Sequence, residues 1–216
     1  MEDLLHGLSV YAIPILFAIT MHEAAHGLAA WALGDDTARR AGRVSLDPLR
    51  HIDPVGTVLL PVLFLFATGG KMVFGWAKPV PVDFGRLRHP KVDMAKVALA
   101  GPAANFVMAL LWRFGFFMGE SLGEGWFSSW LEETARAGVI YNILIMLLNL
   151  FPFPPLDGGR VLVGILPRGA SLVLSALEPW GLVIILFFLA TGLLWQIIMP
   201  FFALFLFLFG MLPHAQ

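Results

Sequence analysis

The residues of this chain best suited to chemistry are two histidines four positions apart, with a glutamate directly after the first. They are His22, Glu23 and His26, in the run His22-Glu23-Ala24-Ala25-His26. Residues four apart share one face of an α-helix, so both imidazoles can bind the same metal ion. Two histidines and a carboxylate form a common ligand set of catalytic zinc, which lowers the pKa of a bound water to about 7. Glu23 lies beside the first ligand, where its carboxylate can reach such a water.

A third ligand must come from elsewhere, because two histidines leave a catalytic zinc site incomplete. The chain contains no cysteine, so a carboxylate is the best remaining choice. Asp157 follows a proline-rich stretch and precedes Gly158 and Gly159, and these residues allow the backbone to turn and aim the carboxylate into the protein. Asp157 could instead cap the short helix expected after it. Beside an incomplete pair of histidines, we favour the ligand role.

The composition indicates that these residues lie in a membrane protein. Hydrophobic residues make up 58% of the 216 residues and charged residues only 13%, whereas soluble domains average about half apolar and about a quarter charged. Much of the surface must therefore face lipid. The net charge of −1 gives no reason to expect nucleic acid as a partner. We expect one membrane-embedded domain over residues 1–216, with the lipid bilayer around it.

Long apolar segments predict transmembrane helices, because a span needs about 20 apolar residues. We expect three core helices and then one short helix, at residues 4–33, 94–118, 135–151 and 158–166. A loop over residues 119–134 should join the second and third core helices. The apolar residues 170–212, interrupted by Pro179, Gly192 and Pro200, predict a C-terminal helical hairpin.

Two stretches between the first two core helices favour strands over helix. Residues 42–46 alternate in polarity, and residues 71–82 combine prolines with β-branched side chains. The predicted fold class is therefore an all-α polytopic membrane protein. It has a core of three transmembrane helices over residues 4–166, a C-terminal helical hairpin and short membrane-associated β-strand segments.

Basic residues predict the orientation of the chain, since cytoplasmic loops carry an excess of Lys and Arg. Such residues are frequent in both polar stretches between the first and second core helices, whereas the next loop is mainly acidic. Both basic stretches can lie in the cytoplasm only if residues 54–68 dip into the membrane and return. We prefer this dip to a full span, and it places the histidine pair toward the cytoplasmic side.

The motifs taken together resemble the site-2 protease family of intramembrane zinc metalloproteases. The match combines the His22-to-His26 motif with Asn149 and, eight residues later, the Asp of Leu156-Asp157-Gly158. Two further runs also resemble family motifs, Gly101-Pro102-Ala103-Ala104-Asn105 and Ala77-Lys78-Pro79-Val80-Pro81-Val82. The resemblance covers about residues 10 to 166. The chain resembles the compact members of the family, which have no PDZ or cystathionine-β-synthase domain. The resemblance also implies that the protein lies in a bacterial or archaeal cell membrane.

The resemblance implies an activity and a role for each site residue. One zinc ion would be held by His22, His26 and Asp157, and Glu23 would act as the general base. Asn149 would contact the substrate or the oxyanion, or would instead satisfy backbone groups at the helix break. The implied substrate is a transmembrane protein, and the strand segments could offer it an edge for pairing or merely plug the bilayer surface.

Two other functional classes remain open from the sequence. Intramembrane ionisable residues also mark transporters, which would carry them along several spans or show repeated halves. A non-catalytic metal-binding membrane protein would lack a ligand or the base. Here the candidate ligands converge on one motif and Asp157, so a zinc metalloprotease is the preferred interpretation.

Overall fold

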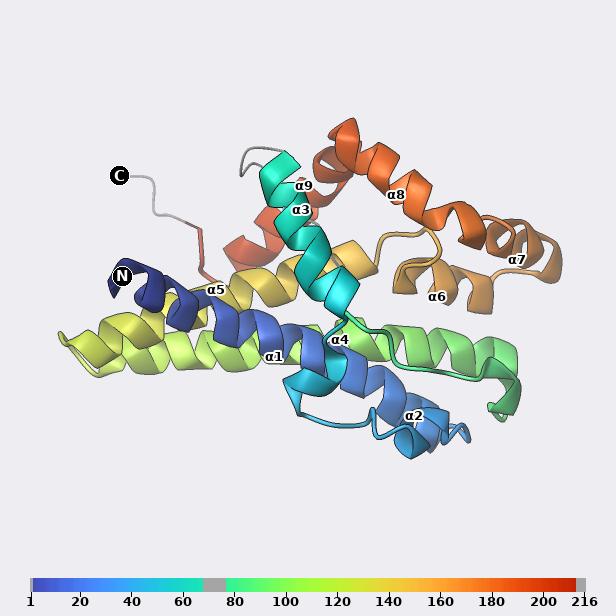
Figure 1. Cartoon of the computed structure of the whole chain (residues 1–216), viewed down its shortest axis with the longest axis horizontal. Helices are drawn as coiled ribbons and strands as arrows, with labels where there is room; N and C mark the ends of the chain where they lie inside the picture. The colour runs from blue at the N-terminus through green and yellow to red at the C-terminus, as the bar shows by residue number, and fades with distance from the viewer. Residues whose placement is uncertain (1, 68–76, 213–216) are drawn as a thin grey trace.

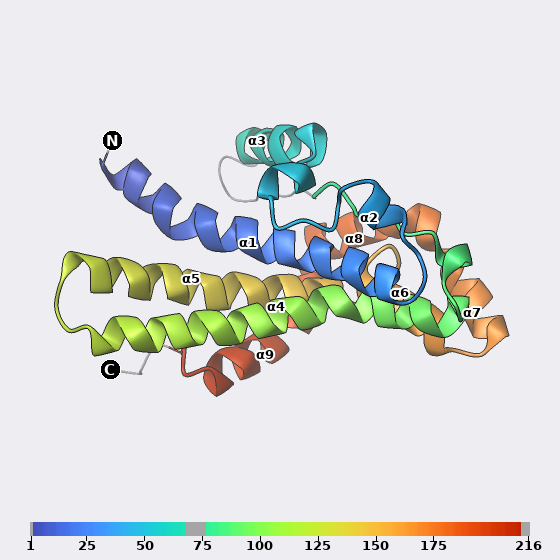
Figure 2. The same cartoon turned by 90° about the horizontal axis from the view of Figure 1, so that it is seen from below.

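The described part of the protein is built around three long helices. The computed structural model describes residues 2–67 and 77–212. Its long helices are α1 (Glu2–Ala32), α4 (Pro90–Ser121) and α5 (Trp126–Asn149). They run side by side, each in contact with the other two (Figures 1 and 2). These helices correspond to the three predicted core helices.

By length and composition, three segments of the described chain could cross a membrane. They are Leu5–Ala32, Pro90–Ser121 and Arg168–Ala190. The first two correspond to α1 and α4, but α5 is not among the three. The reason is that the amino-terminal half of α5 carries Glu132, Glu133 and Arg136, which leave too short an apolar stretch in that helix.

The predicted loop over residues 119–134 is mostly helical. Helix α4 continues to Ser121, and α5 begins at Trp126 rather than near residue 135. The two helices stay in close contact up to this turn because Gly119 has no side chain. A Cβ there would lie 2.6 Å from the Cγ atom of Glu132.

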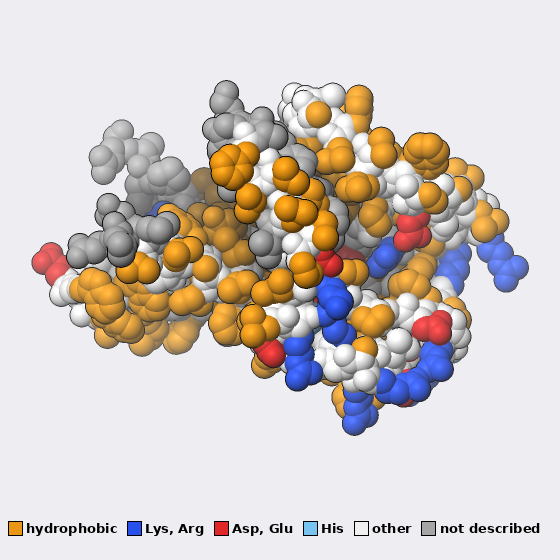
Figure 3. Space-filling model, viewed as in Figure 1, with side chains coloured by type: hydrophobic (Ala, Val, Ile, Leu, Met, Phe, Trp, Pro, Cys, Tyr) orange, Lys and Arg blue, Asp and Glu red, His pale blue; other side chains and the backbone are white. Residues whose placement is uncertain are grey.

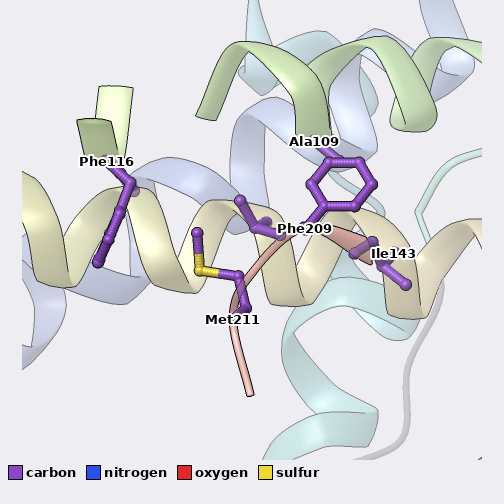
Figure 4. Close-up of a cluster of buried hydrophobic side chains, with 7 residues drawn as sticks. Ala109, Phe116, Ile143, Phe209 and Met211 are labelled. Carbon is purple, nitrogen blue, oxygen red and sulfur yellow. The ribbon is translucent and has the colours of Figure 1, made fainter. Parts of the chain in front are cut away.

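Small and aromatic side chains fill the contact between α4 and α5. In a membrane, close packing holds helices together, and small residues let them approach. Ala109 of α4 and Ala135 of α5 are fully buried in this contact. Figure 4 shows Phe209 and Met211, which follow α9, beside these two helices. The end of the chain therefore closes the helical core.

The predicted C-terminal hairpin is not supported. The region contains short helices instead: α6 (Asp157–Ile165), α7 (Arg168–Ser175), η4 (Glu178–Trp180), α8 (Gly181–Ala190) and α9 (Leu193–Leu208). Gly192, with a φ of 74°, ends α8. After it α9 turns away from α8 (Figure 1) and packs on α5. The proline and glycine breaks therefore divide the apolar stretch into more pieces than two spans.

The predicted strand segments are also not supported, because the described residues contain no strand. Residues 42–46 turn at Gly42, whose φ is 65°. Residues 77–83 run as irregular chain (Figure 1), and their backbone is bound by side chains and by the carbonyl oxygen of His51, not by a neighbouring strand. Pro79 and Pro81 have no N–H for a strand ladder. The first part of the predicted segment, residues 71–76, lies outside the described residues.

Residues 33–67 form short elements, the first two of which contact α1. They are α2 (Thr37–Arg40), η1 (Pro48–His51), the π-helical η2 (Pro54–Leu59) and α3 (Leu60–Ala67), and η3 (Phe84–Arg86) follows further along the chain. Lys and Arg side chains gather around α2, next to a mainly hydrophobic face of the long helices (Figure 3). The dip of residues 54–68 into the membrane and the cytoplasmic orientation stay predictions.

Asp35, just after α1, holds one end of residues 77–83. Its carboxylate accepts hydrogen bonds from the backbone N–H of Thr37 at 3.0 Å and of Asp83 at 2.7 Å. Burial by itself raises the pKa of Asp35, but the hydrogen bonds from Thr37 and Asp83, with the charge of Arg86, hold that pKa below its usual value. The charged carboxylate therefore stabilises the fold.

We expect Asp35→Asn to lower the unfolding temperature at pH 7. Its amide NH₂ would face a backbone donor, at a cost of about 1–3 kcal/mol. Because the folded pKa is depressed, this stabilisation is complete above the unfolded pKa of about 3.9 and is lost as the pH falls through the folded pKa. Circular dichroism in detergent should show the difference between wild type and variant narrowing below about pH 4. A difference that stays constant with pH would contradict this role.

Candidate metal centre

The structure brings together three of the side chains singled out in the sequence. His22 and His26, one turn apart on α1, lie with their Nε2 atoms 3.0 Å apart. Asp157 Oδ2 lies 3.1 Å from His22 Nε2 and 3.2 Å from His26 Nε2. His22 and Asp157 are buried, with only 5% and 6% of their surface exposed. Among the described residues, these three form the group that could hold a metal ion.

The hydrogen bonds behind the histidines favour a cation between these three atoms. His26 Nδ1 lies 2.7 Å from the carbonyl oxygen of Val97, which can only accept, so this nitrogen carries the proton. His22 Nδ1 lies 2.6 Å from Asn105 Oδ1. In neutral imidazoles, both Nε2 atoms then present lone pairs to each other and to Asp157 Oδ2, which is buried without a hydrogen-bond partner. Three converging acceptors fit a bound cation.

A glycine of α4 leaves the space in front of the two imidazoles. A Cβ on Gly101 would lie 2.4 Å from His26 Nε2 and 2.6 Å from His22 Nε2. Since zinc binds histidine nitrogen at about 2.0–2.1 Å, a methyl group there would compete with the ion for the same space. Gly101 of the Gly101-Pro102 motif therefore leaves room for a metal ion, in addition to allowing close helix packing.

Asp157 reaches the histidines through a tight turn after α5. A Cβ on Gly158 would lie 2.2 Å from the carbonyl oxygen of Leu150, and Gly159 is equally crowded. Only glycine fits at these positions, so the chain can fold back closely enough to deliver the carboxylate. Leu156, not Asp157, occupies the N-cap position of α6. The alternative in which Asp157 caps this helix is therefore not what the structure shows.

Glu23 lines a cavity that opens beside the candidate ligands. The cavity has a volume of about 350 Å³, and its walls include His22, His26 and Asp157 as well as residues of the 77–83 segment. Glu23 Oε2 accepts a hydrogen bond of 2.9 Å from the backbone N–H of Val80. The carboxylate is thus held in the wall of the cavity, on the same helix as both histidines.

Asn149 lines the same cavity from the end of α5. Its Nδ2 donates a hydrogen bond of 3.0 Å to the carbonyl oxygen of Ile145, one turn earlier in the helix. This contact is with a carbonyl inside α5 rather than with a backbone group at the helix break. The contact of Asn149 with substrate or oxyanion stays a prediction, and the second N–H of the amide would be the donor for it.

Sequence reasoning missed several residues that build the site. Arg43 is buried and donates to the carbonyl oxygens of Arg50 and Lys78, which anchors the 77–83 segment over the cavity. Nothing in the sequence marks Arg43 among the other basic residues. Asn142 is fully buried in α5. As an isolated amide in an apolar helix, it carried a signal that could have been used.

Known proteins of similar sequence carry names that state a metal and an activity. A Bacillus subtilis protein, named "Putative zinc metalloprotease YwhC", is 33% identical over 184 residues, which cover 84% of this chain and 80% of YwhC. This chain belongs to the same family of zinc metalloproteases. The family supports a metalloprotease function with zinc as the metal, and the group of His22, His26 and Asp157 on α1 and α6 could hold a metal ion.

Longer relatives match over part of their length. "Putative zinc metalloprotease Rip2" of Mycolicibacterium smegmatis is 31% identical over 182 residues, or 82% of this chain and 64% of Rip2. Rip2 of Mycobacterium tuberculosis strain H37Rv is 29% identical over 175 residues, or 79% of this chain and 62% of Rip2. The chain thus spans less than two thirds of these Rip2 proteins. No family model matches the chain, and no solved structure matches it.

Proposed function

We propose that this protein is an intramembrane zinc metalloprotease of the site-2 protease type, which hydrolyses peptide bonds of transmembrane substrates. The observation that carries the proposal is the group of His22, His26 and Asp157, of which the first and third are buried, next to Glu23 in one cavity. The two histidines lie on a helix apolar enough to cross a membrane. Ionisable residues at such positions are costly in lipid and usually functional.

Each site residue has a defined part in this proposal. His22, His26 and Asp157 would hold one Zn²⁺, which would polarise the scissile carbonyl and lower the pKa of a bound water. Glu23 removes a proton from the attacking water and returns it to the leaving amine. The Val80 N–H keeps the Glu23 carboxylate in place between turnovers. Asn149 contacts the bound substrate from the end of α5.

The segment 77–83 forms a wall of the substrate cavity in this proposal, but residues 78–81 offer no N–H for pairing. The N–H of Lys78 is bonded to the carbonyl oxygen of His51 at 2.9 Å, and that of Val80 to Glu23 at 2.9 Å. Pro79 and Pro81 have none. A substrate lying along these residues could pair only by donating its own N–H groups to their carbonyl oxygens, and Arg43 already donates to those of Lys78 and Pro79.

The arrangement favours a protease over a transporter. A transporter needs ionisable groups along a path through the membrane or at the junction of repeated halves. The candidate ligands instead gather at a single point, where the cavity also holds a carboxylate suited to act as a base. The active site would open toward the cytoplasm of a bacterial or archaeal cell, as the basic residues predict.

Metal removal tests the proposal. The purified protein, in detergent or liposomes, is stripped with a chelator and mixed with a transmembrane model substrate or with an unfolded water-soluble protein. We expect the metal-free protein to be inactive, and stoichiometric Zn²⁺ to restore cleavage of the transmembrane substrate. Mass spectrometry of the products locates the cut. Cleavage that persists without metal would contradict the zinc mechanism, and cleavage of the soluble protein alone would contradict the intramembrane specificity.

A further inference from the structure

Two buried asparagines connect the candidate metal ligands to α5. The side chains of Asn105 on α4 and Asn142 on α5 are both fully buried. Asn105 Nδ2 lies 3.0 Å from Asn142 Oδ1, and Asn105 Oδ1 lies 2.6 Å from His22 Nδ1. A chain of hydrogen bonds thus runs from α5 through α4 to His22 on α1, although Asn142 makes neither of its hydrogen bonds to a candidate ligand.

The direction of every hydrogen bond in this chain is fixed by carbonyl groups at its ends. Asn142 Nδ2 lies 2.8 Å from the carbonyl oxygen of Gly138, and Asn105 Nδ2 lies 3.0 Å from that of Ala18. Backbone carbonyls can only accept, so both amide nitrogens must face them. Asn105 Nδ2 therefore also donates to Asn142 Oδ1, and the atom of Asn105 that faces His22 is the acceptor Oδ1.

These hydrogen bonds determine the tautomer of His22. Because Asn105 Oδ1 can only accept, His22 must donate from Nδ1, and in the neutral imidazole its Nε2 then carries a lone pair. Nε2 is the atom that lies 3.1 Å from Asp157 Oδ2. The opposite tautomer would place two acceptors against each other at Asn105 and a proton on the nitrogen that faces the metal position.

We infer that Asn105 and Asn142 are positioning residues that hold His22 in the tautomer and orientation required to bind the metal, with Asn142 acting only through Asn105. The inference rests on the proposed function in taking His22 as a metal ligand. It extends that function by assigning to α5 a part in metal affinity. Removing a hydrogen-bond partner behind a metal-binding histidine typically lowers metal affinity about 10- to 100-fold.

The test measures metal binding rather than cleavage. Metal-free wild type, Asn105→Leu, Asn142→Leu and the double variant are titrated with Co²⁺, whose visible spectrum reports tetrahedral coordination, and with Zn²⁺ against a competing chelator. We expect Asn105→Leu to bind about 10- to 100-fold more weakly. Asn142→Leu should show a smaller loss, and the double variant should match Asn105→Leu, because Asn142 acts through its neighbour.

Two further variants separate positioning from mere stability. Thr134 is also buried in α5, and its hydroxyl has no hydrogen-bond partner among the described residues, so Thr134→Val should keep wild-type metal affinity. Asn142→Asp keeps an oxygen that accepts from Asn105 and should bind metal more tightly than Asn142→Leu. A purely structural role predicts the reverse order, since a buried carboxylate disturbs the helices more than leucine.

The outcomes distinguish the inference from the proposed function. A wild-type protein that binds neither Co²⁺ nor Zn²⁺ would overturn both. Wild-type affinity in Asn105→Leu, or independent additive losses in the double variant, would overturn the inference alone. If Asn105→Leu does not fold, as judged by circular dichroism, the order of Asn142→Asp and Asn142→Leu decides the question.

Discussion

Replacing Glu23 by Gln should leave the metal bound and reduce peptide cleavage by about a hundred- to ten-thousand-fold, the range expected for loss of a general acid–base group. Glutamine has nearly the same shape as glutamate, and its Oε1 can still accept the hydrogen bond that Glu23 accepts from Val80. What it lacks is a basic oxygen to take a proton from water. Initial cleavage rates of a transmembrane substrate and zinc content by mass spectrometry measure the two effects separately.

The matched control for this prediction is His22→Ala, which should lose metal and cleavage together. His22 is buried and its Nε2 belongs to the group that converges on the metal position. The contrast between the variants distinguishes a base from a ligand. If Glu23→Gln cleaves at the wild-type rate, Glu23 has no part in proton transfer, and another group of the cavity must supply the base.

A single methyl group at Gly101 should abolish metal binding. In Gly101→Ala the new Cβ would lie 2.4 Å from His26 Nε2 and 2.6 Å from His22 Nε2, so the imidazoles must move apart or the methyl group must displace the ion. Alanine is at the same time a better helix former than glycine, by about 1 kcal/mol. We therefore expect a folded protein with retained helical content that binds little zinc and shows no measurable cleavage.

Another glycine of α4 provides the control. A Cβ on Gly115 would meet its nearest neighbour, the Cβ of Ala135, at an ordinary contact distance of 3.6 Å. Gly115→Ala should therefore retain zinc and activity, because it makes the same chemical change in the same helix without crowding the site. Full zinc content and wild-type cleavage in Gly101→Ala would show that the ion does not occupy the space between α1 and α4.

Part of the fold follows from local properties of the chain. The apolar lengths predicted α1 and α4 to within a few residues, and the short helix α6 lies where it was expected. The start of α5 at Trp126 was not predicted, and Pro200, which was expected to interrupt the C-terminal stretch, lies inside α9. Glycine and charged residues predicted a loop where α5 begins. Local sequence does not show that packing against a neighbouring helix, here α4, can keep such residues helical.

The residue composition predicted strands, but the described part of these segments is irregular chain held by tertiary contacts. Prolines and valines in residues 77–82 fit an extended conformation, but a strand needs a partner that supplies and accepts hydrogen bonds. In this protein Arg43, Glu23 and Asp35 bind the segment instead. These contacts join parts of the chain that are distant in sequence, so no local pattern indicates them.

The sequence by itself determined that His22 and His26 face the same way, because the spacing of an α-helix is a local property that needs no other part of the chain. It also determined the apolar surroundings, through composition alone. Only the tertiary structure decided that Asp157, Gly101 and the two buried asparagines meet at that helix face. Their positions depend on how α4, α5 and the turn before α6 pack against α1. Such packing results from the shapes of many side chains together, which the residue types at a few spaced positions do not specify.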